Sequence, residues 1–70
     1  MNNFQLYVLR LLQQERTIEI RFGNKIIIGY DRDTFGHHPF FAYKASGSSD
    51  QLGTAEEAWA YIEADLEELP

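Results

Sequence analysis

The sequence contains no cysteine among its 70 residues. This absence excludes disulfide bonds, thiolate metal sites and cysteine nucleophiles. No uninterrupted apolar stretch approaches the ~20 residues that a helix needs to cross a bilayer. The N-terminus also lacks a basic region ahead of an apolar stretch, which a signal peptide would have. We therefore expect a soluble, cytoplasmic protein with no membrane partner.

Positive charge is scarce and unevenly placed. The sequence has six Lys or Arg and eleven Asp or Glu, which gives a net charge of −5. All of the cations lie in residues 1–49, whereas residues 50–70 carry seven anions and no cation. Because contacts between cations and phosphates supply most of the affinity for nucleic acid, we expect nucleic acid to be an unlikely partner.

Catalytic signatures are missing as well. The sequence has no nucleophile elbow, no phosphate-binding loop and no paired-carboxylate pattern. A chain of this length also has little material with which to enclose a water-excluding pocket. We therefore expect a protein that is not an enzyme, with no catalytic residue, no cofactor and no metal. A small metal-dependent or acid–base enzyme that uses His37 or His38 with Asp31 or Asp33 is one alternative.

The composition that remains is that of a folded protein. Hydrophobic residues make up 44% of the sequence and aromatic residues 14%, which argues against disorder. Domains usually have 50 to 250 residues. The chain, residues 1–70, should therefore form a single small domain.

The first segment predicts a helix over residues 3–14. Asn2 or Asn3 can cap it, because a side-chain oxygen there accepts a free backbone N–H. A strand is the alternative, since apolar residues also alternate at the start of the segment. Helical spacing places five apolar residues on one face and leaves Leu6 and Leu9 outside it; the five are Phe4, Tyr7, Val8, Leu11 and Leu12.

Residues 16–30 predict a β-hairpin with strands at 16–22 and 25–30. Two registers are open. A two-residue turn at Gly23 and Asn24 places Ile20 opposite Ile27. A three-residue loop that begins at Phe22 places Ile20 opposite Ile26, and it gathers Ile18, Ile20, Ile26, Ile28 and Tyr30 on one face.

The second half of the chain predicts one more strand and one more helix. A polar loop, Asp31 to His38, leads to Pro39, which favours a strand at 39–45 that lies at the sheet edge or at least starts there. Residues 45–50 are rich in serine and read as a flexible connector. A helix over 54–69 then begins with a capping box formed by Thr54 and Glu57.

The fold class is therefore α+β, in the order α-β-β-β-α, with a three-stranded antiparallel sheet and two helices packed on one face. This order resembles that of double-stranded-RNA-binding domains. That family opens its last helix with a lysine-rich motif, whereas this sequence has Glu56 and Glu57 there. The resemblance thus implies the architecture alone.

The acidic C-terminal helix is the most informative feature for function. We expect a protein–protein interaction or regulatory module that docks through this helix onto a partner with a basic surface. The candidate residues on the helix are Glu57, Tyr61, Asp65, Glu67 and Glu68, with Trp59 or Tyr61 near the rim. The loop before the third strand is the second candidate surface, through Asp31, Asp33, His37 and His38.

Two further expectations concern partners. Nucleic-acid binding through Phe40, Phe41 and Tyr43 of the third strand is the other alternative function. A homodimer is also possible, because several apolar residues exceed what so small a domain can bury; these are Leu6, Leu9 and one of Ile26, Ile27 or Ile28.

Overall fold

The computed structural model describes residues 2–67. Its elements in chain order are α1 (Asn3–Gln13), β1 (Ile18–Phe22), β2 (Ile26–Tyr30), α2 (Arg32–Phe35), β3 (Phe40–Tyr43), β4 (Ser49–Leu52) and α3 (Ala55–Glu67). The α+β class is confirmed. Over the described residues, however, the sheet has four strands instead of three, and a short helix, α2, lies in the expected loop.

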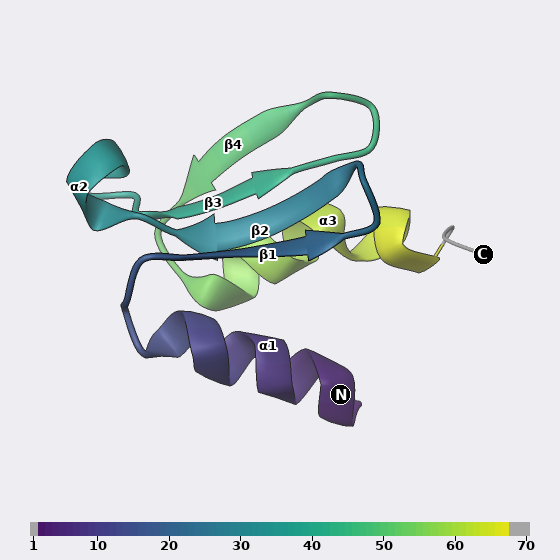
Figure 1. Ribbon diagram of the computed structural model, residues 1–70, viewed down its shortest axis with the longest axis horizontal. Helices are drawn as coiled ribbons and strands as arrows, with labels where there is room; N and C mark the ends of the chain where they lie inside the picture. The colour runs from purple at the N-terminus through teal and green to yellow at the C-terminus, as the bar shows by residue number, and fades with distance from the viewer. Residues whose placement is uncertain (1, 68–70) are drawn as a thin grey trace.

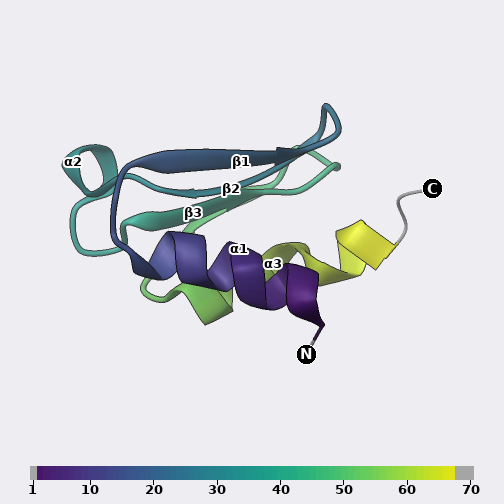
Figure 2. The same cartoon turned by 60° about the horizontal axis from the view of Figure 1, so that its bottom comes forward.

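The four strands form one antiparallel sheet in the order β1-β2-β3-β4. Both long helices lie on the same face of this sheet, as expected (Figures 1 and 2). The packing of α3 is against β2, β3 and β4, and α1 packs against α3 on the β1 side. The sheet thus has one strand more than the α-β-β-β-α order on which the resemblance to double-stranded-RNA-binding domains is based.

The hairpin register differs from both alternatives. Phe22 pairs with Ile26 and Ile20 pairs with Ile28, so the turn consists of Gly23, Asn24 and Lys25. Gly23 has a φ of 65°, which glycine adopts without strain. The face that collects Ile18, Ile20, Ile26, Ile28 and Tyr30 is nevertheless as the three-residue loop predicted. Phe22 stays in the strand because its ring packs beside Phe4 and Trp59.

The expectation that Pro39 starts an edge strand is wrong. The strand β3 lies between β2 and β4, and the ladder pairs begin at Phe40, after the proline. Pro39 contributes its carbonyl, which accepts the backbone N–H of Asp31 at 2.8 Å. The expected connector at 45–50 forms a turn at Gly47, where φ is 95°, and then enters β4.

The core lies between the sheet and the two helices. From α1 it takes Val8, Leu9 and Leu12, whereas Phe4 and Tyr7 are 53% and 62% exposed. The buried face of α1 is therefore rotated about the helix axis relative to the predicted one, with Leu9 buried and Phe4 and Tyr7 exposed. Leu9, Ile26 and Ile28 are buried, so they cannot supply the expected dimer contact.

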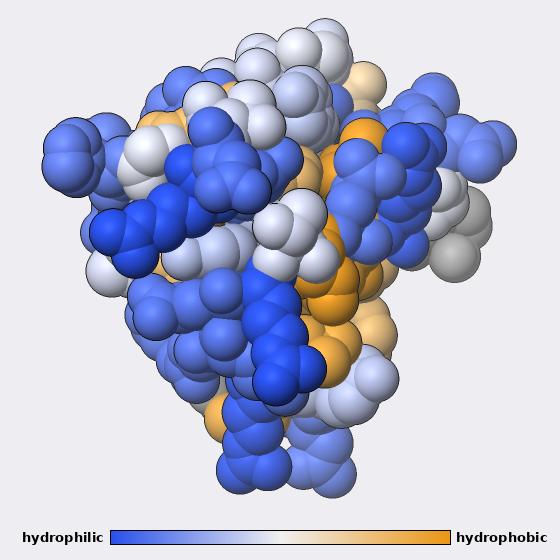
Figure 3. Space-filling view, turned by 60° about the vertical axis from the view of Figure 1, so that its left-hand side comes forward, coloured by the Kyte–Doolittle hydropathy of each residue, from blue (hydrophilic) through white to orange (hydrophobic). Residues whose placement is uncertain are grey.

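Some apolar surface remains outside the core. Seen from the side on which α2 lies, hydrophobic side chains reach the surface as a narrow strip bordered by hydrophilic ones (Figure 3). The most exposed large apolar side chains of the described residues are Phe4, Tyr7 and Tyr43. Such exposure is concentrated on α1 and on the sheet face opposite the helices.

Candidate functional site

Two of the expected docking carboxylates hold α3 in place. Thr54 Oγ1 accepts the backbone N–H of Glu57 at 3.1 Å and donates to Glu57 Oε1 at 3.2 Å, so the expected helix cap is confirmed. Farther along the helix, Asp65 Oδ2 accepts the backbone N–H of Ala45 at 3.1 Å. Asp65 therefore ties the second half of α3 to the turn between β3 and β4.

Tyr61 contacts the same turn. The Nζ atom of Lys44 lies 4.5 Å from the centroid of the Tyr61 ring, which is a cation–π geometry. Lys44 directly follows β3, and the Tyr61 side chain is half-buried. Tyr61 and Asp65 thus both hold α3 against the start of the turn between β3 and β4.

The second candidate surface is built around α2. Asp31 caps this short helix, because its carboxylate accepts the backbone N–H of Thr34 at 3.1 Å and the Thr34 hydroxyl at 2.8 Å. Asp33, His37 and His38 are exposed. Within residues 2–67, no group of three or more His, Cys, Asp or Glu could hold a metal ion.

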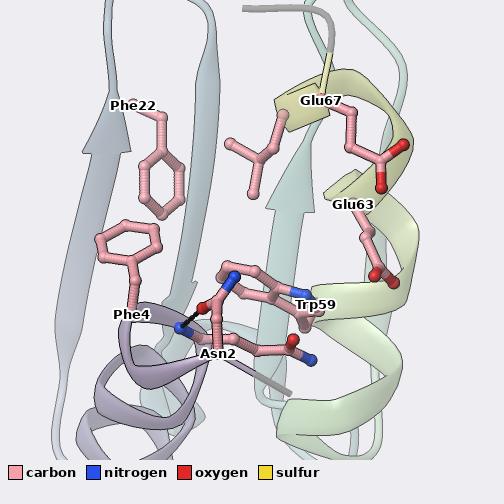
Figure 4. A pocket seen from close by; sticks show the side chains of 8 residues that line it. Asn2, Phe4, Phe22, Trp59, Glu63 and Glu67 are labelled. Carbon is pink, nitrogen blue, oxygen red and sulfur yellow. Dashed lines mark hydrogen bonds between the residues drawn. The ribbon is translucent and has the colours of Figure 1, made fainter.

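The remaining expected residues belong to the end of α3. Glu68 lies outside the described residues. Glu67 is exposed and lines a groove of about 360 Å³ between the start of α1 and the end of α3. The residues that line this groove are Asn2, Phe4, Gln5, Phe22, Trp59, Glu63, Leu66 and Glu67 (Figure 4). We call it the helix-end groove.

The floor of the helix-end groove is aromatic. The rings of Phe4, Phe22 and Trp59 contact one another edge-to-face, with centroids 5.6 to 6.3 Å apart. They come from α1, β1 and α3, which the chain brings together only in the folded state. Leu66 completes the apolar lining, and Asn2 is fixed at the entrance because its side chain accepts the Gln5 backbone N–H at 2.7 Å.

One polar atom in this floor is unsatisfied. Trp59 is 5% exposed, and its indole Nε1 is buried with no hydrogen-bond partner among the described residues. A buried donor without a partner costs about 1–3 kcal/mol. Such atoms are rare in native folds and call for an explanation.

The side of the groove formed by α3 is negatively charged. Glu63 and Glu67 both come from α3, across the groove from Phe4 and Phe22 (Figure 4). Neither carboxylate has an ion-pair partner within residues 2–67. The last turn of α3 also contains no basic residue, so the negative end of the helix dipole adds to the two charges.

The predicted nucleic-acid surface is mostly inaccessible. Phe40 faces the helices and packs against Tyr30, with centroids 4.9 Å apart. Phe41 points to the opposite face, where it lies under Phe35 at 5.2 Å and is 8% exposed. Of the three expected stacking rings, Tyr43 alone is exposed.

Comparisons with known proteins do not place this chain in a family. No family model matches it, and neither the curated proteins nor the solved structures include a match. None of the helices within residues 2–67 is both long and apolar enough to cross a membrane. The proposed function therefore rests on the geometry and chemistry of the described residues.

The sequence identified one wall of the groove and missed the other. The acidic end of α3 and the proximity of Trp59 to it follow from helical spacing. Helical spacing assigns Phe4 to a buried face, and the hairpin pattern assigns Phe22 to a turn or a strand, so nothing in the linear pattern joins either residue to Trp59. One signal for the aromatic floor is available in the sequence: the predicted helix over 3–14 has two aromatic residues, Phe4 and Tyr7, near its start.

Proposed function

We propose that this domain binds a segment of a partner protein in the helix-end groove, and that it does so without chemistry of its own. The segment carries an apolar side chain flanked by lysine or arginine. The observation that carries this proposal is the aromatic floor, which lies beside two carboxylates that have no ion-pair partner within residues 2–67.

The floor suits an apolar anchor. Phe4 is 53% exposed although it contacts two other rings, so a partner side chain placed on it would remove apolar surface from water. Aromatic clusters of this kind often supply most of the binding energy at protein interfaces. The groove volume of about 360 Å³ fits one or two side chains.

The rim selects the charge of the partner. Glu63, Glu67 and the carboxyl end of α3 together present negative potential beside the apolar floor. Cationic side chains on both sides of the anchor would meet these groups. Such rim charges contribute mainly to specificity and to the association rate, and salt screens them.

Titration calorimetry with two short acetylated peptides tests this proposal. One peptide places a leucine between lysines, and the other places the same leucine between glutamates. We expect saturable binding of the lysine peptide at low salt, weaker binding at high salt, and no binding of the glutamate peptide. Equal affinity for both peptides, or binding of neither, would contradict the proposal.

Variants locate the binding. The double variant Glu63→Gln/Glu67→Gln should weaken the lysine peptide by about 2- to 30-fold, because two exposed charge contacts are lost at ~0.2–1 kcal/mol each. A matched control, Asp33→Asn/Asp50→Asn, removes the same charge away from the groove and should bind as the wild type does. Phe4→Ala should also weaken binding, whereas Tyr43→Ala on the far sheet face should not.

A further inference from the structure

The strand β1 is an open edge of the sheet. It has β2 on one side and no strand on the other among the described residues. Its three apolar side chains, Ile18, Ile20 and Phe22, are half-buried, although they point to the helix-covered face. Native proteins usually protect such edges, because an unpaired strand is a template for another strand.

The flank of α1 beside this edge is also apolar. Phe4, Tyr7 and Leu11 follow helical spacing and form one stripe, in which Phe4 and Tyr7 are exposed and Leu11 is half-buried. The contact of Phe4 with Phe22 places the stripe on the β1 side. The helix runs antiparallel to β1 along this side of the sheet (Figures 1 and 2).

We propose that two copies of this chain pair through β1, antiparallel and about a twofold axis at Ile20, so that one sheet runs through the dimer. In this arrangement Ile20 lies opposite the partner's Ile20, and Ile18 lies opposite the partner's Phe22. The α1 stripes of the two copies then meet on the helix side of the joint sheet. The occupant of the open edge is thus a second copy of the chain.

Charge selects this register. Glu19 and Arg21 lie on the other face of β1, exposed, and pair within the strand at 2.8 Å. With Ile20 on the axis, Glu19 lies opposite the partner's Arg21, and Arg21 lies opposite the partner's Glu19. The strand is therefore complementary to itself, and two cross-strand ion pairs form.

Other registers are disfavoured. A shift of two residues in one direction places Glu19 opposite the partner's Glu19, and in the other direction it places Arg21 opposite the partner's Arg21. A shift of one residue turns the apolar face of one copy toward the charged face of the other. The pairing centred on Ile20 avoids all three conflicts.

The dimer uses Phe4 and Phe22, which also belong to the floor of the helix-end groove, but it does not involve the carboxylates of that groove. Glu63 and Glu67 lie on the α3 side of that groove, away from the β1 edge (Figure 4). The two carboxylates of each groove therefore stay outside the pairing edge, whereas Phe4 belongs to both proposed surfaces. Failure of peptide binding would leave this proposal standing, and a monomer would leave the peptide proposal standing.

Sedimentation equilibrium over a range of concentrations tests the pairing by charge exchange. We expect the wild type to be a dimer. Glu19→Arg and Arg21→Glu each create two like-charge oppositions, so each should raise the dimer dissociation constant by at least about tenfold. The double variant Glu19→Arg/Arg21→Glu restores opposite charges and should restore the dimer.

A second pair of variants tests the α1 stripe. Tyr7→Glu should weaken the dimer, whereas Asn3→Glu adds the same charge to the same helix outside the stripe and should not. Circular dichroism confirms that each variant is folded, since all four positions are exposed. A monomeric wild type would overturn the proposal. So would a dimer that the single exchanges leave unchanged, or one that the double exchange fails to restore.

Discussion

Gly29 lies where two strands and an aromatic ring meet. A Cβ atom at this position would collide with the Ile18 carbonyl and with the Phe41 ring. The absence of a side chain leaves room for the Phe41 ring beside Gly29, where Phe35 of α2 packs on the same ring and Phe41 is buried.

Gly29→Ala should therefore lower the free energy of unfolding by about 1–3 kcal/mol, the usual cost of overpacking. Gly53→Ala is the matched control, because a Cβ there meets nothing closer than His38 Nδ1 at 3.6 Å. Urea unfolding midpoints compare the two. Similar midpoints for both variants would show that Phe41 moves aside at little cost.

Asp65 is the second residue whose role the fold changes. Helical spacing suggests that its charge serves a partner, yet its carboxylate accepts the Ala45 N–H. Hydrogen bonds to charged groups contribute about 1.5–3 kcal/mol when buried, and exposure of this one reduces that figure.

Asp65→Ala should thus destabilise the domain, whereas Glu67→Ala, in the same helix, should not. Thermal unfolding of the two variants gives the comparison. An equal melting temperature for both would mean that the Asp65 contact adds nothing to stability.

At the scale of the elements, the sequence pattern correctly predicts the two long helices, whose first turns are capped by nearby side chains. Asn2 caps α1, and Thr54 caps α3. Alternation gave β1. The missed elements have weaker signals: β4 is polar and exposed over most of its length, and α2 is a single turn with no buried residue, although Asp31 caps it. The strand β4 forms because β3 pairs with it, which is a tertiary effect.

The cap of α3 leads to a prediction at this scale. Thr54→Ala removes the acceptor for the Glu57 N–H and should cost about 0.5–2 kcal/mol. Thr54→Ser keeps the hydroxyl and serves as the control. The midpoints of urea unfolding should separate the two variants, and coinciding midpoints would show that the hydroxyl does not stabilise α3.

Over the whole molecule, the structure shows where the negative charge of the C-terminal segment lies. Asp65 and Glu57 are used within the fold, so the carboxylates left for a partner gather at the end of α3, beside the helix-end groove. The acidic side of this site could be predicted from the sequence. Its aromatic floor could not, because Phe4, Phe22 and Trp59 converge from three elements.

The central claim is that this groove is where a basic, apolar segment binds. The sequence has one tryptophan, so the Trp59 indole N–H gives a single resonance in a ¹H–¹⁵N spectrum. Titration with the lysine-flanked leucine peptide should shift this resonance saturably, together with the backbone resonances of Phe4 and Glu67, and the glutamate peptide should not. An indole resonance that stays in place while residues of the far sheet face shift would contradict the account.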